Sequence, residues 1–145
     1  MFYVGIDIAK KNHEAFIINA NDKLINKSIS FLNSQTGSSK LISLLEKYSI
    51  DVSNVVIGMK ETSYYWLSPY SHLLELSYTV YVMNPIQSDA LRKMDIRQNY
   101  SKDSFIIAQI MRFGKFFTTF LANDDIMSLR HLFRYRLALV DKYSY

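Results

Sequence analysis

Residues 2–9 read FYVGIDIA, a stretch in which Val and Ile alternate with Tyr3, Gly5 and Asp7. Successive side chains of a β-strand point to opposite faces, so this alternation predicts a strand with one apolar face. Asp7 is the only charged residue of the stretch, and it lies on the other face, close to the carboxyl end. A lone carboxylate at the end of an apolar strand is a candidate functional group.

The remainder of the chain predicts a mixed sheet with helices. Short connections make the first three strands an antiparallel meander, after which helices and strands alternate. The order βββαβαβα describes an α/β, ribonuclease H-like fold with a mixed five-stranded sheet, in which the fourth strand lies parallel to the first, and C-terminal helices follow. The predicted strands are 2–9, 14–19, 24–31, 55–59 and 78–83, and the predicted helices are 34–48, 62–76, 86–94, 103–113 and one from residue 124 or 125.

The composition is that of one globular domain without cysteine. Of 145 residues, 49% are hydrophobic and 21% are charged, and Cys is absent. This composition excludes a disulfide scaffold, thiolate zinc sites and a cysteine nucleophile, and the three His residues lack metal-ligand spacing. The first residues contain neither the basic start of a signal peptide nor an apolar run long enough for a membrane span. We therefore expect a cytoplasmic protein with no membrane partner.

Basic charge is concentrated in the last third of the chain. Residues 1–90 contain 7 Lys or Arg against 8 Asp or Glu, whereas residues 91–145 contain 10 against 5. This asymmetry favours a polyanionic partner, most simply a nucleic acid such as DNA. Arg130, Arg134 and Arg136 lie on the last predicted helix and are candidate nucleic-acid contacts, although a solvated charged face explains them equally well.

The predicted topology brings acidic positions together. In this fold an Asp on the first strand, an acid at the end of the neighbouring parallel strand and acids on a later helix meet at one end of the sheet. Such a cluster binds two Mg²⁺ ions, which activate the attacking oxygen and stabilise the leaving oxygen in phosphodiester chemistry. Asp7 on the first strand is therefore a candidate ligand, and its simpler alternative is a hydrogen-bonded structural Asp. Asp103, taken alone, is explained as the N-cap of a later helix.

Four blocks along the chain resemble the DEDD transposases of insertion-sequence family one-ten, relatives of the Piv DNA invertases. The similarity spans essentially the whole chain, and the ordered set of blocks is more specific than any single block. The blocks are residues 4–10 (VGIDIAK), 58–66 (GMKETSYYW), 84–88 (NPIQS) and 102–109 (KDSFIIAQ).

The resemblance implies a RuvC-like catalytic domain at residues 1–121. Residues 122–145 would then be the start of a basic helical extension, cut off before the C-terminal Ser domain of the family. The resemblance also implies Mg²⁺-dependent strand exchange on DNA, a structured guide RNA as a further partner, a homo-oligomer and a bacterial cytoplasmic setting. Asp7 and Asp103 match acidic positions of the family, where they would serve as catalytic residues and metal ligands.

Two of the four acidic positions of the family are changed in this chain. The second is Lys60 and the third is Tyr100. Glu61 is adjacent to the lost second acid, but a shift by one residue along a strand turns a side chain to the opposite face. Glu61 is therefore a displaced catalytic candidate, and an acid in the first turn of a helix is the simpler interpretation. An ammonium and a phenol in place of two carboxylates predict impaired metal-dependent catalysis.

Two other functions remain open on the sequence. A non-catalytic nucleic-acid-binding or assembly module would use the basic last helix without any chemistry. An actin-like sugar kinase fragment would also open with a strand that carries Asp. Such kinases follow this Asp with a Gly-rich phosphate turn, whereas Ile8, Ala9 and Lys10 follow it here.

Overall fold

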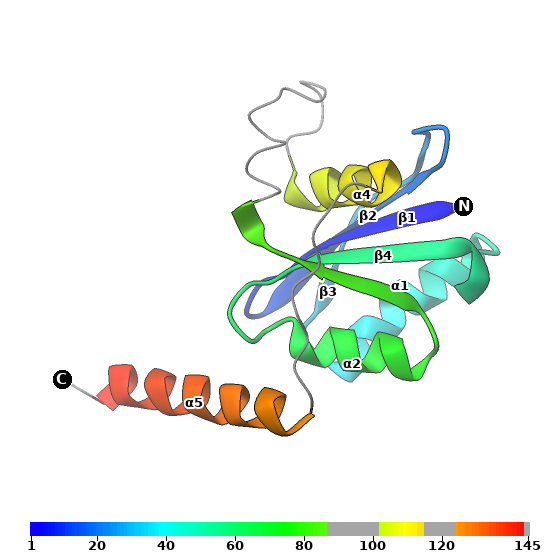
Figure 1. Ribbon diagram of the computed structural model, residues 1–145. Helices are drawn as coiled ribbons and strands as arrows, with labels where there is room; N and C mark the ends of the chain where they lie inside the picture. Colours follow the sequence, from blue (N-terminus) through cyan, green and yellow to red (C-terminus); the bar gives the residue numbers. More distant parts are fainter. Residues whose placement is uncertain (87–101, 115–123, 144–145) are drawn as a thin grey trace.

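The computed structural model describes residues 1–86, 102–114 and 124–143. A five-stranded sheet forms its centre, with helices on both faces (Figure 1). The elements are β1 (Phe2–Asp7), β2 (Asn12–Asn19), β3 (Leu24–Leu32), α1 (Gln35–Lys47), the 3-10 helix η1 (Val52–Asn54), β4 (Val55–Lys60), α2 (Leu67–Glu75), β5 (Thr79–Met83), α4 (Asp103–Phe113) and α5 (Asp124–Tyr143).

The sheet has the order β3-β2-β1-β4-β5. β1 pairs antiparallel with β2 and parallel with β4, and β4 pairs parallel with β5. This arrangement confirms the predicted mixed sheet and the parallel pairing of the first and fourth strands. The predicted helix at 86–94 lies outside the described residues except for its first residue.

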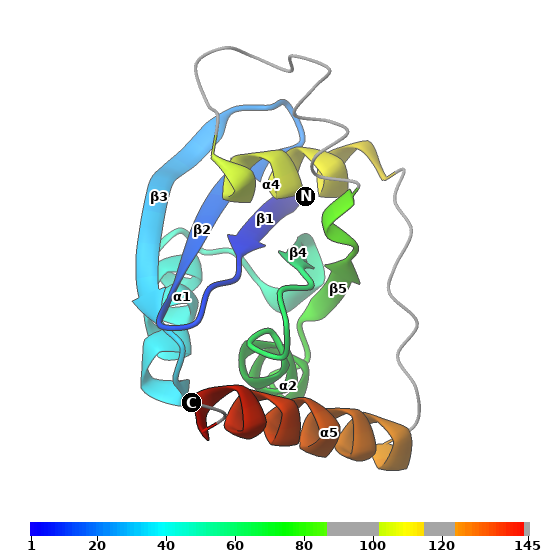
Figure 2. The same cartoon turned by 90° about the vertical axis from the view of Figure 1, so that its left-hand side faces the viewer.

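Helices cover the two faces of the sheet unequally. α1 and α2 pack on one face and α4 packs on the other, as the view in Figure 2 shows. The core beneath α1 and α2 is formed by the alternate apolar residues of the central strands together with Leu41, Leu45, Trp66 and Leu73. Beneath α4, apolar residues of the helix meet the other face of the strands: Met83, Ile106, Ile107, Ile110 and Met111 in one cluster, Phe16, Ile18, Phe105 and Ala108 in another.

Two glycines let α4 approach the sheet closely. Gly5 of β1 and Gly58 of β4 are direct neighbours in the parallel register. A Cβ on Gly5 would lie 1.9 Å from the backbone oxygen of Ser104 and 2.4 Å from the backbone nitrogen of Ala108. Because the backbone of α4 occupies the space of a side chain, only glycine fits at this point of β1. This contact places the first turn of α4 above the carboxyl end of β1.

One prediction about helices is corrected by the structure. α2 begins at Leu67, not at residue 62, because Ser63 adopts a left-handed backbone conformation with φ 51°, which interrupts a helix. The last helix, α5, has several exposed apolar residues. Phe133, Leu137 and Val140 of α5 are 58%, 47% and 50% exposed. The division into residues 1–121 and 122–145 stays a prediction.

His13 of β2 predicts a loss of stability in mild acid. Its side chain is 0% exposed, its Nδ1 accepts a hydrogen bond from the Ala9 backbone, and burial lowers its pKa, although a hydrogen bond with Asn33 raises it in part. Because folded His13 resists protonation more than the unfolded residue, its stabilising contribution is lost as the pH falls below the ordinary pKa of about 6.5. We expect the free energy of unfolding to fall by up to about 1.4 kcal/mol per pH unit below that value.

Urea unfolding between pH 7.5 and pH 5 measures this effect. The His13→Gln variant should have a weaker pH dependence than the wild type. An equal pH dependence of the His13→Gln variant and the wild type would show that His13 is not the responsible group.

Candidate carboxylate and lysine site

The register of the central strands brings three charged residues together at one end of the sheet. Asp7 ends β1, and its antiparallel partner on β2 is Glu14. On the other side, Ile6 pairs with Met59 of β4, so the next residues along these parallel strands, Asp7 and Lys60, are also neighbours. Asp7 shares the face of Gly5, and Lys60 that of Gly58, because side chains alternate along a strand. All three charged side chains therefore lie on the face that α4 covers.

The first turn of α4 adds Asp103 to this group. Lys60 Nζ donates a hydrogen bond to Asp103 Oδ2 at 2.9 Å and lies 3.7 Å from Asp7 Oδ1. The side chains of Lys60 and Asp103 are 17% and 16% exposed, and that of Asp7 is 33% exposed. The ammonium of Lys60 thus lies between the two carboxylates that the sequence predicted as metal ligands. Asp103 is not a helix N-cap, since Lys102 occupies the cap position.

Glu61 is oriented away from this group. Its Oε1 lies 3.8 Å from Arg134 Nη2 of α5, and its backbone N–H donates to Met83 O of the neighbouring strand β5. Lys60 contacts Asp103 of α4 and Glu61 contacts Arg134 of α5, and these helices lie on opposite sides of the sheet (Figure 1), so the two side chains point to opposite faces. Glu61 also precedes α2 by six positions, so it is not an acid of that helix's first turn as the simpler interpretation predicted.

A second ionic contact lies beside the site, and the sequence patterns did not predict it. Lys102 Nζ forms an ion pair with Glu14 Oε1 and lies 3.3 Å from Ser28 Oγ, and Ser28 Oγ donates a hydrogen bond to the same carboxylate. Burial raises the pKa of Glu14, but the contacts with Lys102 and Ser28 outweigh it, and the pKa is lowered overall. The antiparallel pairing of the first two strands was the available signal, because it places Glu14 opposite Asp7.

The residues at this end of the sheet do not fit a pair of divalent ions. Mg²⁺ prefers several charged oxygen ligands, whereas here an ammonium already occupies the space between two carboxylates. Within residues 1–86, 102–114 and 124–143, no group of three or more His, Asp or Glu side chains could hold a metal ion. Tyr100, the other position at which the sequence predicts a lost acid, lies outside the described residues.

The three arginines predicted to contact nucleic acid all lie on α5, in different surroundings. Arg136 is exposed, whereas Arg134 donates a hydrogen bond from Nη1 to the backbone oxygen of Ser63 at 2.7 Å. The side chain of Arg130 is outside the described part of the structure.

None of the described helices has the length and apolar character that a membrane span requires.

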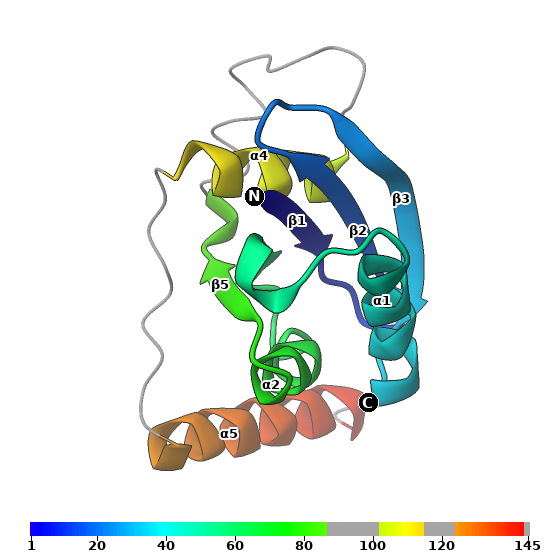
Figure 3. The same ribbon diagram turned by 90° about the vertical axis from the view of Figure 1, so that its right-hand side faces the viewer.

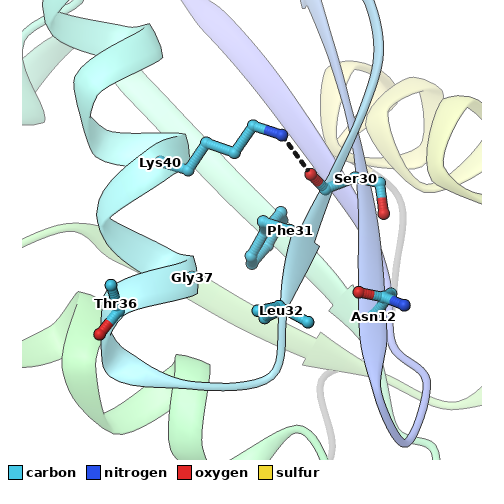
Figure 4. Close-up of a pocket in the computed structure, with 7 residues that line it drawn as sticks. All are labelled: Asn12, Ser30, Phe31, Leu32, Thr36, Gly37 and Lys40. Atoms are coloured by element: carbon cyan, nitrogen blue, oxygen red, sulfur yellow. Dashed lines mark hydrogen bonds between the residues drawn. The ribbon is translucent and has the colours of Figure 1, made fainter.

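A pocket of about 300 Å³ lies on the other face of the sheet, between α1 and β3 (Figure 4). The side chain of Lys40 extends from α1 towards β3, where its Nζ donates a hydrogen bond to Ser30 O at 2.8 Å. None of the predicted site residues lines it, so we do not assign a function to it. Its walls are formed by Asn12, Ser30, Phe31, Leu32, Thr36, Gly37 and Lys40.

Comparisons with known proteins agree with this fold and sequence pattern. RuvC of Thermus thermophilus in complex with a Holliday junction substrate has a TM-score of 0.55 at 12% identity, over 82% of this chain and 99% of that chain. A further Thermus thermophilus RuvC structure has a TM-score of 0.54 at 12% identity, over 82% and 100% of the two chains. At such identity the likeness shows the fold alone, which is RuvC-like and therefore ribonuclease H-like.

The sequence comparisons are more specific. No curated protein matches the chain in sequence. The profile of one protein family, the DEDD transposases of type IS110, described as Transposase, matches residues 4–145. Because this match spans nearly all of the sequence, the chain belongs to the DEDD transposase family of type IS110.

Proposed function

We propose that this chain is a DNA-binding, RuvC-like transposase domain in which metal-dependent strand exchange is impaired. The position of the Lys60 ammonium, 2.9 Å from Asp103 Oδ2 and 3.7 Å from Asp7 Oδ1, carries this proposal. Asp7 and Asp103 would be the remaining carboxylates of the family's catalytic site. Glu61 does not replace the lost acid, because its carboxylate contacts Arg134 on the opposite face.

Electrostatics supports the loss of metal binding. At an effective dielectric constant of 20, an ammonium about 4 Å from an ion of charge +2 is repelled by roughly 8 kcal/mol. The two aspartates already interact with Lys60, and Glu14 interacts with Lys102, so the charge that would attract a cation is largely balanced. A divalent ion would have to displace an ammonium before it met its ligands.

Calorimetric titration with Mn²⁺ and a nicking assay on junction DNA test this proposal together. We expect no two-site binding at micromolar Mn²⁺ and no nicking above background, because the ligand set is incomplete. Two-site binding together with nicking that Asp7→Asn abolishes would contradict the proposal, since it would require a working metal centre around Asp7.

DNA is the proposed partner for two reasons. The basic residues are concentrated in the last third of the chain, and Arg136 is exposed on α5. In addition, the RuvC structure with a similar fold holds a Holliday junction. A structured guide RNA and a homo-oligomer belong to the same proposal, as expectations from the family. A non-catalytic binding or assembly module is the second candidate, and the balanced charges of the site favour it.

The affinity for DNA should depend on salt. If two or three arginines contact phosphates, the association constant should fall by about 10- to 40-fold between 50 and 200 mM salt, because each contact releases counterions. Fluorescence anisotropy with a labelled junction measures this fall, and Arg136→Gln should reduce the logarithmic slope by about one. An association constant that does not change with salt would mean that no phosphate contacts are made, and it would contradict the proposed DNA binding.

A further inference from the structure

Arg134 anchors α5 to the segment that follows β4. Its Nη1 donates a hydrogen bond to Ser63 O at 2.7 Å, and its Nη2 lies 3.8 Å from Glu61 Oε1. One planar guanidinium therefore contacts two oxygens of a single short segment. A guanidinium can contact two oxygens of a phosphate in the same way. The contact joins residues 71 positions apart. α5 lies alongside α2, on the other side of the sheet from α4 (Figure 1, Figure 3).

The acceptor that holds Arg134 is fixed by the core. Ser63 O also accepts a hydrogen bond from Trp66 Nε1 at 3.1 Å, and Trp66 is 1% exposed. A ring contact between Tyr64 and His131, with centroids 5.6 Å apart, lies beside it. Arg134 is therefore held at a defined place in the free protein, although its side chain is still 31% exposed.

We propose that Glu61 is an internal competitor of DNA phosphate for Arg134. In the free protein the carboxylate of Glu61 and the carbonyl of Ser63 occupy the guanidinium donors that a phosphate would use. When DNA binds, phosphate oxygens replace these two acceptors. The hydrogen bond from Arg134 to Ser63 O is then lost, whereas the hydrogen bond from Trp66 Nε1 to Ser63 O is kept. A partly exposed ion pair is weak, so a polyanion can displace it. The inference rests on the proposed DNA binding and gives the displaced acid of this chain a regulatory role in place of a metal-binding one.

The inference predicts that removing the negative charge of Glu61 strengthens DNA binding. We expect Glu61→Gln to lower the dissociation constant for junction DNA by about three- to tenfold while keeping the salt slope of the wild type, because Arg134 contacts phosphate in both complexes. Glu75→Gln is the matched control, because Glu75 is an exposed acid at the end of α2 and the same charge is removed. The control should keep a dissociation constant close to that of the wild type.

Arg134 and Trp66 supply the second half of the test. In an Arg134→Gln background, Glu61→Gln should have no further effect, because the residue for which the two anions compete is gone. Trp66 is the only tryptophan of the chain. Its emission should change when DNA binds to the wild type, since Ser63 O loses one of its two donors, and should not change in Arg134→Gln. Arg136→Gln should weaken DNA binding but keep the change in emission.

The outcomes separate this inference from the proposed function. If the wild type binds no DNA at low salt, the proposed function fails and the inference fails with it. If the wild type binds DNA but Glu61→Gln and Glu75→Gln have equal affinities, only the competition is overturned. Nicking by the wild type that is lost in Glu61→Gln would identify Glu61 as a metal ligand and would overturn both.

Discussion

The Lys60→Glu variant should bind Mn²⁺ at least one hundredfold more tightly than the wild type. The substitution removes the ammonium between Asp7 and Asp103 and adds a third carboxylate at the same position. A hundredfold change corresponds to about 2.7 kcal/mol, which is a minor part of the roughly 8 kcal/mol of repulsion that the ammonium exerts on a divalent ion. Three carboxylates on one face would also supply the oxygen ligands that such an ion prefers.

Isothermal titration calorimetry with Mn²⁺ measures this effect. Lys60→Gln removes the repulsion without adding a ligand, so its affinity should lie between those of the wild type and Lys60→Glu. Lys47→Glu is the control for net charge, because Lys47 is exposed in the last turn of α1. If Lys60→Glu binds Mn²⁺ no better than Lys47→Glu, the charge of residue 60 does not control metal binding.

Metal should also stabilise the Lys60→Glu variant. Without metal, three carboxylates at close range repel one another, so we expect its melting temperature to lie below that of the wild type. A ligand that binds only the folded state raises stability with concentration, so Mn²⁺ should raise the melting temperature of the variant. The wild type should melt at the same temperature with Mn²⁺ and with EDTA.

The Gly5→Ala variant should lose about 3 kcal/mol of folding free energy. The new Cβ would lie 1.9 Å from Ser104 O and 2.4 Å from Ala108 N, and both atoms belong to the backbone of α4. A helix backbone cannot move aside as a flexible side chain can, so either α4 shifts away from the sheet or β1 is distorted. A shift of α4 would also carry Asp103 away from Lys60.

Gly58→Ala is the matched control for this effect. Gly58 is the direct neighbour of Gly5 in the sheet, but the three atoms nearest to its Cβ would be side-chain atoms of Met111, at 2.6 to 2.9 Å. Because Met is flexible, we expect a loss of about 1 kcal/mol. Denaturant unfolding monitored by Trp66 fluorescence measures both variants. Equal losses would show that the backbone of α4 does not limit the space at Gly5.

Local patterns predicted the sheet well because each strand is either an alternation of apolar and polar residues, as in β3, or a short continuous apolar run, as in β4. All five predicted strands are present, with ends displaced by at most two residues. The start of α2 was predicted too early because the left-handed conformation of Ser63 has no counterpart in the apolar spacing. The exposure of the apolar residues of α5 could not be predicted either, because periodicity shows which residues share a face but not what covers that face.

From the sequence alone, we predict that Lys60 stands at an acidic position of the family and that Glu61, one residue further on, is displaced from that position. Both conclusions are local, since they depend on residue identity and on the period of two along a strand. Only the tertiary structure decided which groups meet. Lys60 and Asp103 are 43 positions apart, and Glu14 and Lys102 are 88 positions apart. Their contacts depend on strand register and on the close packing of α4 on two glycines, which arise from interactions between distant parts of the chain.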